Sequence, residues 1–324
     1  MNPRVRKFLS ICIKIAIIGL AFSYIFRKLS DNQSIADFRM LLTELSAGKV
    51  WLVLSAVILL MFLNWFLESL KWKYLVQKIE NIAIWKAVES VFCGLTWAVF
   101  TPNRIGEFGG RVLFLSPRKR IMGVVAMSVG SFGQMAVTNV IGSLALFWFV
   151  FNFMNLNPFL LFGIGFLIVI FCGFFLLFYF NIHWIDGLLS GINFMQRYKR
   201  FFIIFARYNK SELFRIMIYC ISRYLVYTTQ YYLIIHLLVP DIRAFDMIMI
   251  LFVFYFIQSA LPSIDLLDIG VRAGTASYFF AFVTDQELAI MASIASIWLI
   301  NLIIPAILGS VFVLKLKFFD SSAN

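Results

Sequence analysis

Residues 101–111 read TPNRIGEFGGR and interrupt an apolar run that extends over residues 87–115. The break leaves one apolar arm of about 15 residues and one of about 10 residues or fewer, whereas a helix that crosses the bilayer needs about 20 residues at 1.5 Å per residue. Basic residues flank both ends of the run, at Lys86 and at residues 118–120. Because Lys and Arg mark cytoplasmic loops, both ends belong inside the cell. The run therefore predicts a re-entrant helical hairpin that enters the membrane from the cytoplasm.

A second apolar run, residues 247–283, is interrupted by LPSIDLLDIG at residues 261–270. It ends at TDQE, residues 284–287, a loop that has acidic residues and no Lys or Arg. The same charge rule places such a loop outside, so this run predicts a hairpin that enters from the outer face. Irregular backbone survives at membrane depth only where protein or water satisfies its polar groups. Both breaks therefore predict a polar interior.

The composition is that of a membrane protein. Of 324 residues, 62% are hydrophobic and 14% are charged, with a mean hydropathy of +0.91, whereas about a quarter of an average soluble domain is charged. The formal net charge of +12 gathers in short segments between apolar runs. That pattern indicates cytoplasmic loops rather than a nucleic-acid surface. We therefore expect an all-α polytopic membrane protein with no nucleic-acid partner.

Six apolar stretches are long enough to cross the bilayer. They are residues 8–26, 50–70, 121–151, 159–180, 213–238 and 288–314. Basic residues at both ends of the chain predict cytoplasmic N and C termini. We predict a single transmembrane domain over residues 1–324, with an amphipathic segment at 182–212 on the inner surface. The order span, hairpin, span occurs at 50–151 and again, inverted, at 213–314, which is typical of secondary transporters.

Charged residues at membrane depth are candidate substrate ligands. They are Arg104, Glu107 and Arg111 in the first break, Asp265, Asp268 and Arg272 in the second, and Arg223 within the span at 213–238. In the functional interpretation, Arg104 and Arg111 bind an anionic headgroup, helped by the helix N-terminus after Pro102, while the carboxylates balance or gate the site. In the structural alternative, Arg104–Glu107 and Asp268–Arg272 pairs only hold the breaks together. Arg223 is either a third substrate ligand or a side chain that snorkels to the interface.

Other polar residues favour structural roles. Asn64 and Glu68 lie one turn apart in the second span, and with Gln134 they predict hydrogen bonds between helices. The four cysteines are scattered through apolar runs, and the two histidines have no second ligand at metal spacing. Since no nucleophile–base pair is readable either, we expect no catalytic residue, no metal and no cofactor.

Two short motifs carry a family resemblance. The first is PNRIGE at residues 102–107, followed by Arg111, and the second joins LPS at 261–263 to GVR at 270–272, with Pro102, Gly106, Pro262 and Gly270 as their structural residues. They resemble the signature regions of the flippase-like transmembrane domain of bacterial lysylphosphatidylglycerol synthases. The family usually carries Glu just after its Gly-Val-Arg, whereas Ala273 stands here. A carboxylate relocated to Asp265 or Asp268 is the corresponding hypothesis.

The resemblance implies a function in lipid transport. It implies translocation of aminoacylated or related phospholipids across the bacterial inner membrane, with lipid synthesis in a separate cytosolic domain that these 324 residues lack. We therefore expect a stand-alone lipid flippase or transporter of a lipid-linked intermediate that is not itself an enzyme. Its expected partners are membrane lipids with anionic phosphate headgroups. The alternative is a non-catalytic membrane partner or regulator of a glycosyl- or lipid-transferring enzyme.

Overall fold

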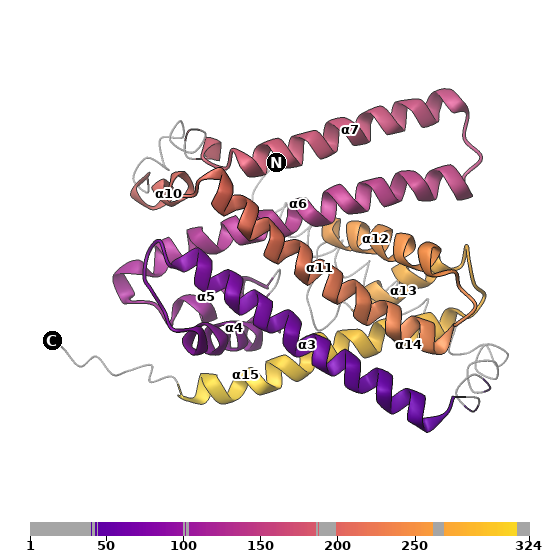
Figure 1. The fold of residues 1–324 in the computed structure, drawn as a ribbon, viewed down its shortest axis with the longest axis horizontal. Coiled ribbons are helices and arrows are strands. Elements are labelled where there is room, and N and C mark those ends of the chain that lie inside the picture. Colours follow the sequence, from indigo (N-terminus) through magenta and orange to yellow (C-terminus); the bar gives the residue numbers. More distant parts are fainter. Residues whose placement is uncertain are drawn as a thin grey trace, which may run out of the picture. The chain divides into compact units, whose positions relative to one another are not determined.

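The computed structural model describes residues 40, 43, 45–99, 101, 104–185, 187, 199–261 and 269–315. All regular elements in this part of the chain are helices (Figure 1). In chain order they are α3 (Ala47–Val76), α4 (Ile84–Val99), α5 (Ile105–Val112), the 3-10 helix η2 (Pro117–Lys119), α6 (Arg120–Phe153), α7 (Pro158–Phe180), α10 (Lys199–Ala206), α11 (Lys210–Leu238), α12 (Ala244–Ala260), α13 (Ile269–Phe280), α14 (Glu287–Trp298), the π-helix η3 (Leu299–Ile303) and α15 (Ile304–Lys315). The predicted all-α class is confirmed for these residues.

Four helical segments in the described part are long and apolar enough to cross a membrane. They are Ala47–Val76, Pro117–Phe153, Pro158–Phe180 and Glu287–Val313, and the apolar helix Ala244–Ala260 is shorter. Helix α11 coincides with the predicted span at 213–238 but contains Arg215 and Arg223. The predicted first span, residues 8–26, lies outside the described residues. The chain is therefore a polytopic helical membrane protein, as its composition predicts.

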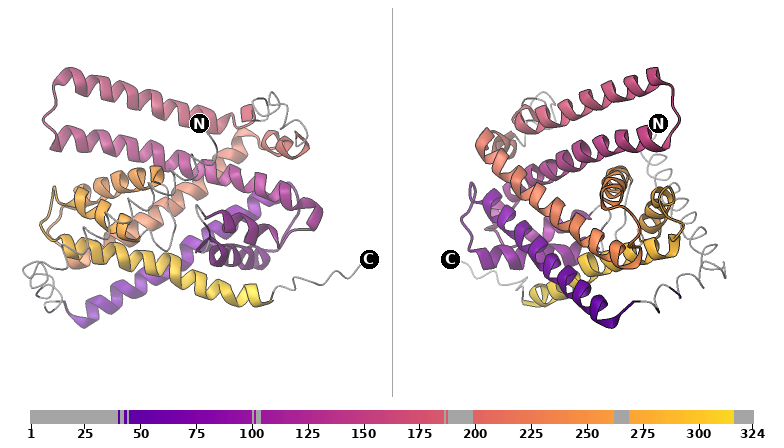
Figure 2. Two further views of the ribbon diagram at one scale, coloured as in Figure 1. Left: turned by 180° about the vertical axis from the view of Figure 1, so that it is seen from behind. Right: turned by 45° about the vertical axis from the view of Figure 1, so that its right-hand side comes forward.

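Helix α5 lies within the first sequence break and packs against α4, which precedes the break (Figures 1 and 2). They run antiparallel, because Gly106 lies against the carbonyl of Trp97 while Gly110 lies against Gly94. Between them, the backbone N–H of Gly106 donates to Oγ1 of Thr101 over 2.7 Å. Arg104 takes the left-handed conformation, with φ of 57°, which a non-glycine residue rarely adopts. The tight turn is thus confined to residues 101–104, and the rest of the predicted break is helical.

The second sequence break separates α12 from α13. Helix α12 ends at Ala260, Leu261 is extended, and α13 begins at Ile269. Helix α13 packs against both α12 and α14, and Ser277 donates from its hydroxyl to Glu287 at the start of α14 over 3.0 Å. Residues 262–268 lie outside the described part. The predicted hairpin at the second break therefore stays a prediction, of which the structure describes only the two flanking helices.

Backbone contacts divide the chain into two compact units. The first is Met1–Leu60, Thr138–Cys172 and Val226–Trp298, and the second is Met61–Val137, Gly173–Leu225 and Leu299–Asn324. Helices α3, α6, α7 and α11 each contribute residues to both units. In the first unit, Phe149 is buried and its ring meets those of Phe279 and Phe282 at 5.3 and 4.9 Å between centroids. The second unit contains the first break and the charged residues around it.

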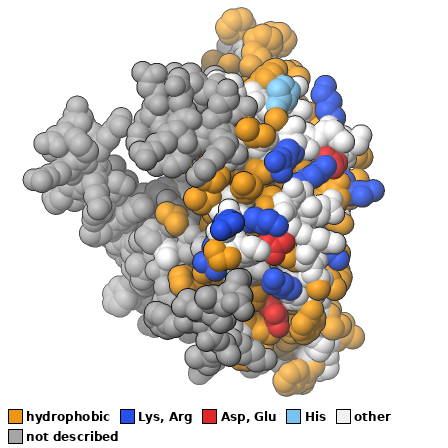
Figure 3. Space-filling view, turned by 90° about the vertical axis from the view of Figure 1, so that its left-hand side faces the viewer, with side chains coloured by type: hydrophobic (Ala, Val, Ile, Leu, Met, Phe, Trp, Pro, Cys, Tyr) orange, Lys and Arg blue, Asp and Glu red, His pale blue; other side chains and the backbone are white. Residues whose placement is uncertain are grey.

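One end of the second unit is rich in charge. Lys and Arg side chains gather on the face shown in Figure 3, with acidic side chains among them. Lys78 pairs with Glu212 at 2.6 Å, and Arg207 donates to the carbonyl of Lys78 over 3.3 Å. The apolar side chains of α10 are buried at Phe201, Ile204 and Phe205. These three side chains of α10 therefore pack against protein, whereas Trp184 and Ile203 are exposed. The position of the amphipathic segment on the inner surface stays a prediction.

Candidate functional site

Glu68 on α3 is the centre of a buried ionic cluster in the second unit. Its carboxylate accepts from Nη1 of Arg111 on α5 at 2.5 Å and from Nζ of Lys71 at 2.7 Å. It also accepts from Nη1 of Arg223 on α11. The four side chains are between 2% and 9% exposed. Three cationic side chains from three helices therefore share one buried carboxylate.

A second carboxylate, Glu107, completes the cluster. Arg111 donates from Nη2 to Glu107, one helical turn away on α5. Arg104 donates from Nε to the other oxygen of Glu107 over 2.9 Å, so the predicted Arg104–Glu107 pair forms. Arg111 thus bridges two carboxylates with its two terminal nitrogens. Its Nε is buried and has no hydrogen-bond partner among the described residues.

Neutral groups surround Arg223. Its Nε donates to Oδ1 of Asn64 over 2.9 Å, and its Nη1 donates to Oε1 of Gln134 on α6 over 2.8 Å. The guanidinium carbon also lies 5.3 Å from the centre of the Trp65 ring, within the range of a cation–π contact. The Arg223 side chain is therefore buried and held by several partners. It does not extend to the membrane interface, as the snorkelling alternative would require.

The local sequence explains how these side chains converge. Asn64, Glu68 and Lys71 are spaced four and three residues apart on α3, so they share one face of that helix. Glycine then brings α4 close to α5: a Cβ atom on Gly94 would lie 2.8 Å from Cγ of Arg111. The Arg111 side chain passes over this glycine towards α3. The absence of a side chain at Gly94 therefore leaves the space that the buried Arg111 side chain occupies.

The buried part of the cluster has more cations than anions. Among the described residues, Lys71, Arg111 and Arg223 face the carboxylates of Glu68 and Glu107. Burying an ion costs several kcal/mol even after relaxation, and only close opposite charges and hydrogen bonds offset that cost. Arg side chains also bind carboxylate and phosphate oxygens in a bidentate manner. The arrangement is suited to an anionic group that would add to, or replace, one of the carboxylates.

The other predicted site residues that the structure describes are not among the partners of Glu68 and Glu107. Arg272 lies in the first unit, where it is half-buried and its charge interacts with Tyr231. Gly270 is buried on the same helix, α13, and Gly106 is buried at the turn of the first break. Pro102, Pro262, Asp265 and Asp268 lie outside the described residues. A role for Arg272 and the two aspartates in substrate binding stays a prediction.

Sequence reasoning underestimated two residues on α3. Glu68 is predicted only as an interhelical hydrogen-bonding group, and Lys71 only as a marker of the cytoplasmic end of its span. The structure continues α3 to Val76 and buries Lys71 beside Glu68. The available signal was the occurrence of Asn64 and Glu68 one turn apart in an otherwise apolar helix. Among the described residues, no group of His, Cys, Asp and Glu side chains could hold a metal ion.

The fold and the site define a polytopic helical membrane protein with a buried, Arg-rich ionic cluster at the turn of a helical hairpin. The sequence profile described as "Lysylphosphatidylglycerol synthase TM region" matches residues 11–309. The chain therefore belongs to this family of membrane domains associated with lipid handling, as its two motifs indicate. Neither a curated protein nor a solved structure matches the chain.

Proposed function

We propose that this protein moves a lipid, or a lipid-linked intermediate, with an anionic phosphate headgroup between the leaflets of the bacterial inner membrane. The observation that supports this most directly is the state of Arg111. Its side chain is 2% exposed, bridges Glu68 and Glu107, and keeps one buried donor without a partner among the described residues. A phosphate group offers that donor an acceptor and adds negative charge to a cluster in which cations exceed anions.

The decreasing exposure of three cluster side chains indicates the route of the headgroup in this proposal. Arg104 is 35% exposed, Glu107 13% and Arg111 2%. In our proposal the phosphate first meets Arg104, whose left-handed backbone places it at the turn, and then exchanges with the carboxylates around Arg111. Glu68 and Glu107 hold the arginines when no lipid is bound. This exchange keeps each buried cation paired throughout, and so avoids the cost of an isolated charge at membrane depth.

The membrane arrangement is part of the proposal. Helices α4 and α5 form a re-entrant hairpin from the cytoplasm, and α12 and α13 form its counterpart from the outer face. The units at 50–151 and 213–314 are then inverted repeats, with six full spans and both termini in the cytoplasm. Broken helices of inverted repeats form the binding sites of many secondary transporters. The protein acts as a transporter and not as an enzyme in this proposal.

The test is translocation of a fluorescent phosphatidylglycerol in proteoliposomes, with wild type compared with Arg104→Ala. Arg104 is the most exposed cation of the cluster, so its removal disturbs folding least. We expect the rate to fall towards that of protein-free vesicles. Arg215→Ala is the matched control, because Arg215 is an exposed arginine whose Cζ lies 5.5 Å from the Tyr74 ring, away from the cluster. An Arg104→Ala rate equal to that of the control contradicts the proposal.

A second candidate function is a non-catalytic membrane partner or regulator of a glycosyl- or lipid-transferring enzyme. Helix α7 favours it, because none of the residues in its most hydrophobic window is buried. Phe159, Phe162 and Val169 are 82%, 75% and 68% exposed. Such a face contacts lipid or another membrane helix. Folded protein that translocates no lipid with any headgroup favours this second function.

A further inference from the structure

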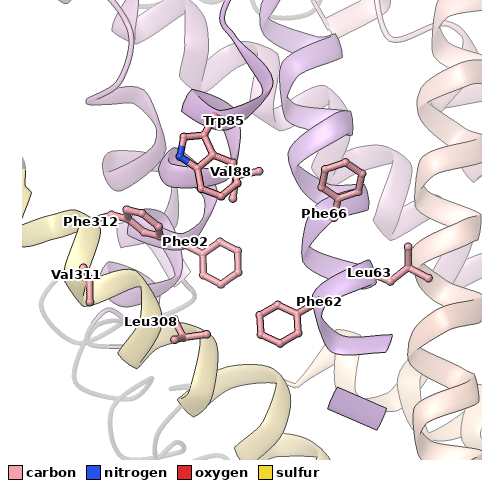
Figure 4. Close-up of a pocket in the computed structure, with 9 residues that line it drawn as sticks. All are labelled: Phe62, Leu63, Phe66, Trp85, Val88, Phe92, Leu308, Val311 and Phe312. Carbon is pink, nitrogen blue, oxygen red and sulfur yellow. The ribbon is translucent and has the colours of Figure 1, made fainter. Parts of the chain in front are cut away.

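The second unit has an apolar cavity on a different face from the ionic cluster. It measures about 640 Å³ and is formed by α3, α4 and α15. Figure 4 shows Phe62 and Phe66 on one wall, Trp85 and Phe92 on the other, and Leu308 and Phe312 from α15 closing one side. Every lining residue is hydrophobic. The volume falls within the range of roughly 300–1,000 Å³ that is usual for ligand pockets.

The cavity is open to its surroundings. Phe62, Phe66 and Leu308 are 46%, 46% and 39% exposed. It is separate from the charges, because Phe62 and Phe66 lie on the face of α3 opposite Asn64, Glu68 and Lys71 at a helical period of 3.6 residues. The two features are therefore different sites on the same helix.

The walls of the cavity are fixed by close helix packing. The hydroxyl of Thr96 on α4 donates to the carbonyl of Ala306 on α15 over 2.8 Å. A Cβ atom on Gly309 would collide with the carbonyl oxygen of Phe92, so the two backbones touch there. Phe92 and Phe312 meet edge-on with ring centres 6.3 Å apart. Close packing of α4 against α15 thus fixes one side of the groove.

The depth of the groove in the membrane indicates which kind of molecule fills it. Phe62 and Phe66 lie in the middle of the candidate span Ala47–Val76, and Leu308 lies in the span Glu287–Val313. At that depth an apolar groove meets hydrocarbon and not water, and a void there forfeits dispersion contacts with its walls. At one end stands Trp85, 66% exposed and followed by the exposed Lys86. Trp and basic residues are typical of the level of the lipid headgroups.

We propose that this groove binds one acyl chain of an anionic phospholipid, with the phosphate at the level of Trp85 and Lys86. The chain lies along Phe66 and Phe92 towards Phe62 and Leu308. Lys86 supplies the charge that favours an anionic headgroup, as basic residues do at the cytoplasmic surface of a membrane. The site does not depend on lipid translocation, because it uses none of the residues of the ionic cluster.

The test uses phosphatidylglycerol with a photoreactive diazirine on one acyl chain, in vesicles of phosphatidylglycerol and phosphatidylethanolamine. After irradiation, mass spectrometry locates the modified residues. We expect several-fold more label on the groove walls than on Phe162 and Phe166 of α7, which are exposed on an open helix face. Equal labelling of the two regions would show ordinary surrounding lipid and would overturn the proposal, as would groove walls that carry no label.

Two variants sharpen the test. Leu308→Trp fills the groove, and we expect it to lose the groove label while the α7 label is unchanged. Leu167→Trp on the exposed face of α7 is the matched control and keeps the groove label. Lys86→Gln removes the preference for phosphatidylglycerol over photoreactive phosphatidylcholine. Arg104→Ala leaves the groove label intact, so loss of translocation and loss of this site are distinguished. Groove labelling that persists in Leu308→Trp contradicts the proposal.

Discussion

Nη1 of Arg111 lies 2.5 Å from Oε1 of Glu68, although the two residues are 43 positions apart on different helices. This contact joins the last turn of α5 to α3, a long candidate membrane span. Because Glu68 also binds Lys71 and Arg223, one carboxylate links α3, α5 and α11. The stability of the second unit and the position of the candidate site therefore depend on the same ion pairs.

Removal of Glu68 is the first test of this dependence. Glu68→Ala leaves three buried cations short of a partner, and breaking a buried pair costs about 3–5 kcal/mol. We expect a loss of that size in the free energy of unfolding, measured by denaturant titration in detergent micelles. Glu89→Ala on α4 replaces a carboxylate outside the cluster, for which a change within about 0.5 kcal/mol is expected. Similar losses in the two variants would mean that Glu68 is not the centre of the cluster.

The shape of the Arg111 side chain matters as well as its charge. Lys has no planar fork and cannot bridge two carboxylates with parallel hydrogen bonds. We expect Arg111→Lys to fold but to translocate phosphatidylglycerol several-fold more slowly than wild type in proteoliposomes. Arg215→Lys makes the same exchange outside the cluster and should keep the wild-type rate. A full rate in Arg111→Lys would show that charge alone is sufficient.

Glycine 94 provides a steric test of the hairpin. A Cβ atom there would lie 2.8 Å from Cγ of Arg111 and 2.9 Å from the carbonyl oxygen of Glu107. The backbone of α5 must then move, so Gly94→Ala should lower the free energy of unfolding by about 1–3 kcal/mol. A Cβ atom on Gly109 meets nothing within 4 Å. Gly109→Ala is therefore the matched control, and it should be neutral or stabilising by up to about 1 kcal/mol. Equal effects in the two variants would exclude the close α4–α5 contact.

The start of α11 predicts a pH dependence of stability. Burial alone would raise the pKa of Glu212, but the hydrogen bond and charge of Lys78, with the backbone N–H of Asn209, hold that pKa below its ordinary value of 4.5. A carboxylate whose pKa is lowered by folding stabilises the protein above pH 4.5, and this contribution is lost as the pH falls through the folded value. We expect the unfolding midpoint of wild type to fall more steeply below pH 4.5 than that of Glu212→Gln. Parallel pH profiles would contradict this expectation.

The turn of the first break and its Arg104–Glu107 pair could be predicted from the sequence. Gly and Pro mark the interruption at residues 101–111, and Arg104 and Glu107 are close enough along a helix to pair without tertiary information. The long-range pairs could not be predicted, because Glu68 is 155 positions from Arg223. Local periodicity does not say which faces of α3 and α11 meet. The positive charge of Lys71 predicted the end of the second span near residue 70. In the structure Lys71 pairs with Glu68, one helical turn earlier, and α3 continues to Val76.

The apolar groove was equally invisible to sequence reasoning. Its walls come from Phe62, Phe92 and Leu308, which are ordinary lipid-compatible residues in three separate runs. Hydropathy reports that such residues prefer hydrocarbon, but it does not distinguish a packed helix face from an open one. The groove forms where Thr96 and Gly309 bring α4 against α15. The Thr96–Ala306 hydrogen bond at this contact joins residues 210 positions apart.

The headgroup dependence of lipid movement tests the central claim most directly. Fluorescent lipids with anionic, zwitterionic and cationic headgroups are compared in proteoliposomes of the wild-type protein, with translocation followed by quenching of the outer leaflet. Because cations exceed anions in the buried part of the cluster, we expect the anionic lipid to move fastest and the Arg104→Ala variant to lose that preference. Equal rates for all three headgroups, or a preference that survives in Arg104→Ala, would contradict a phosphate-binding site at the first break.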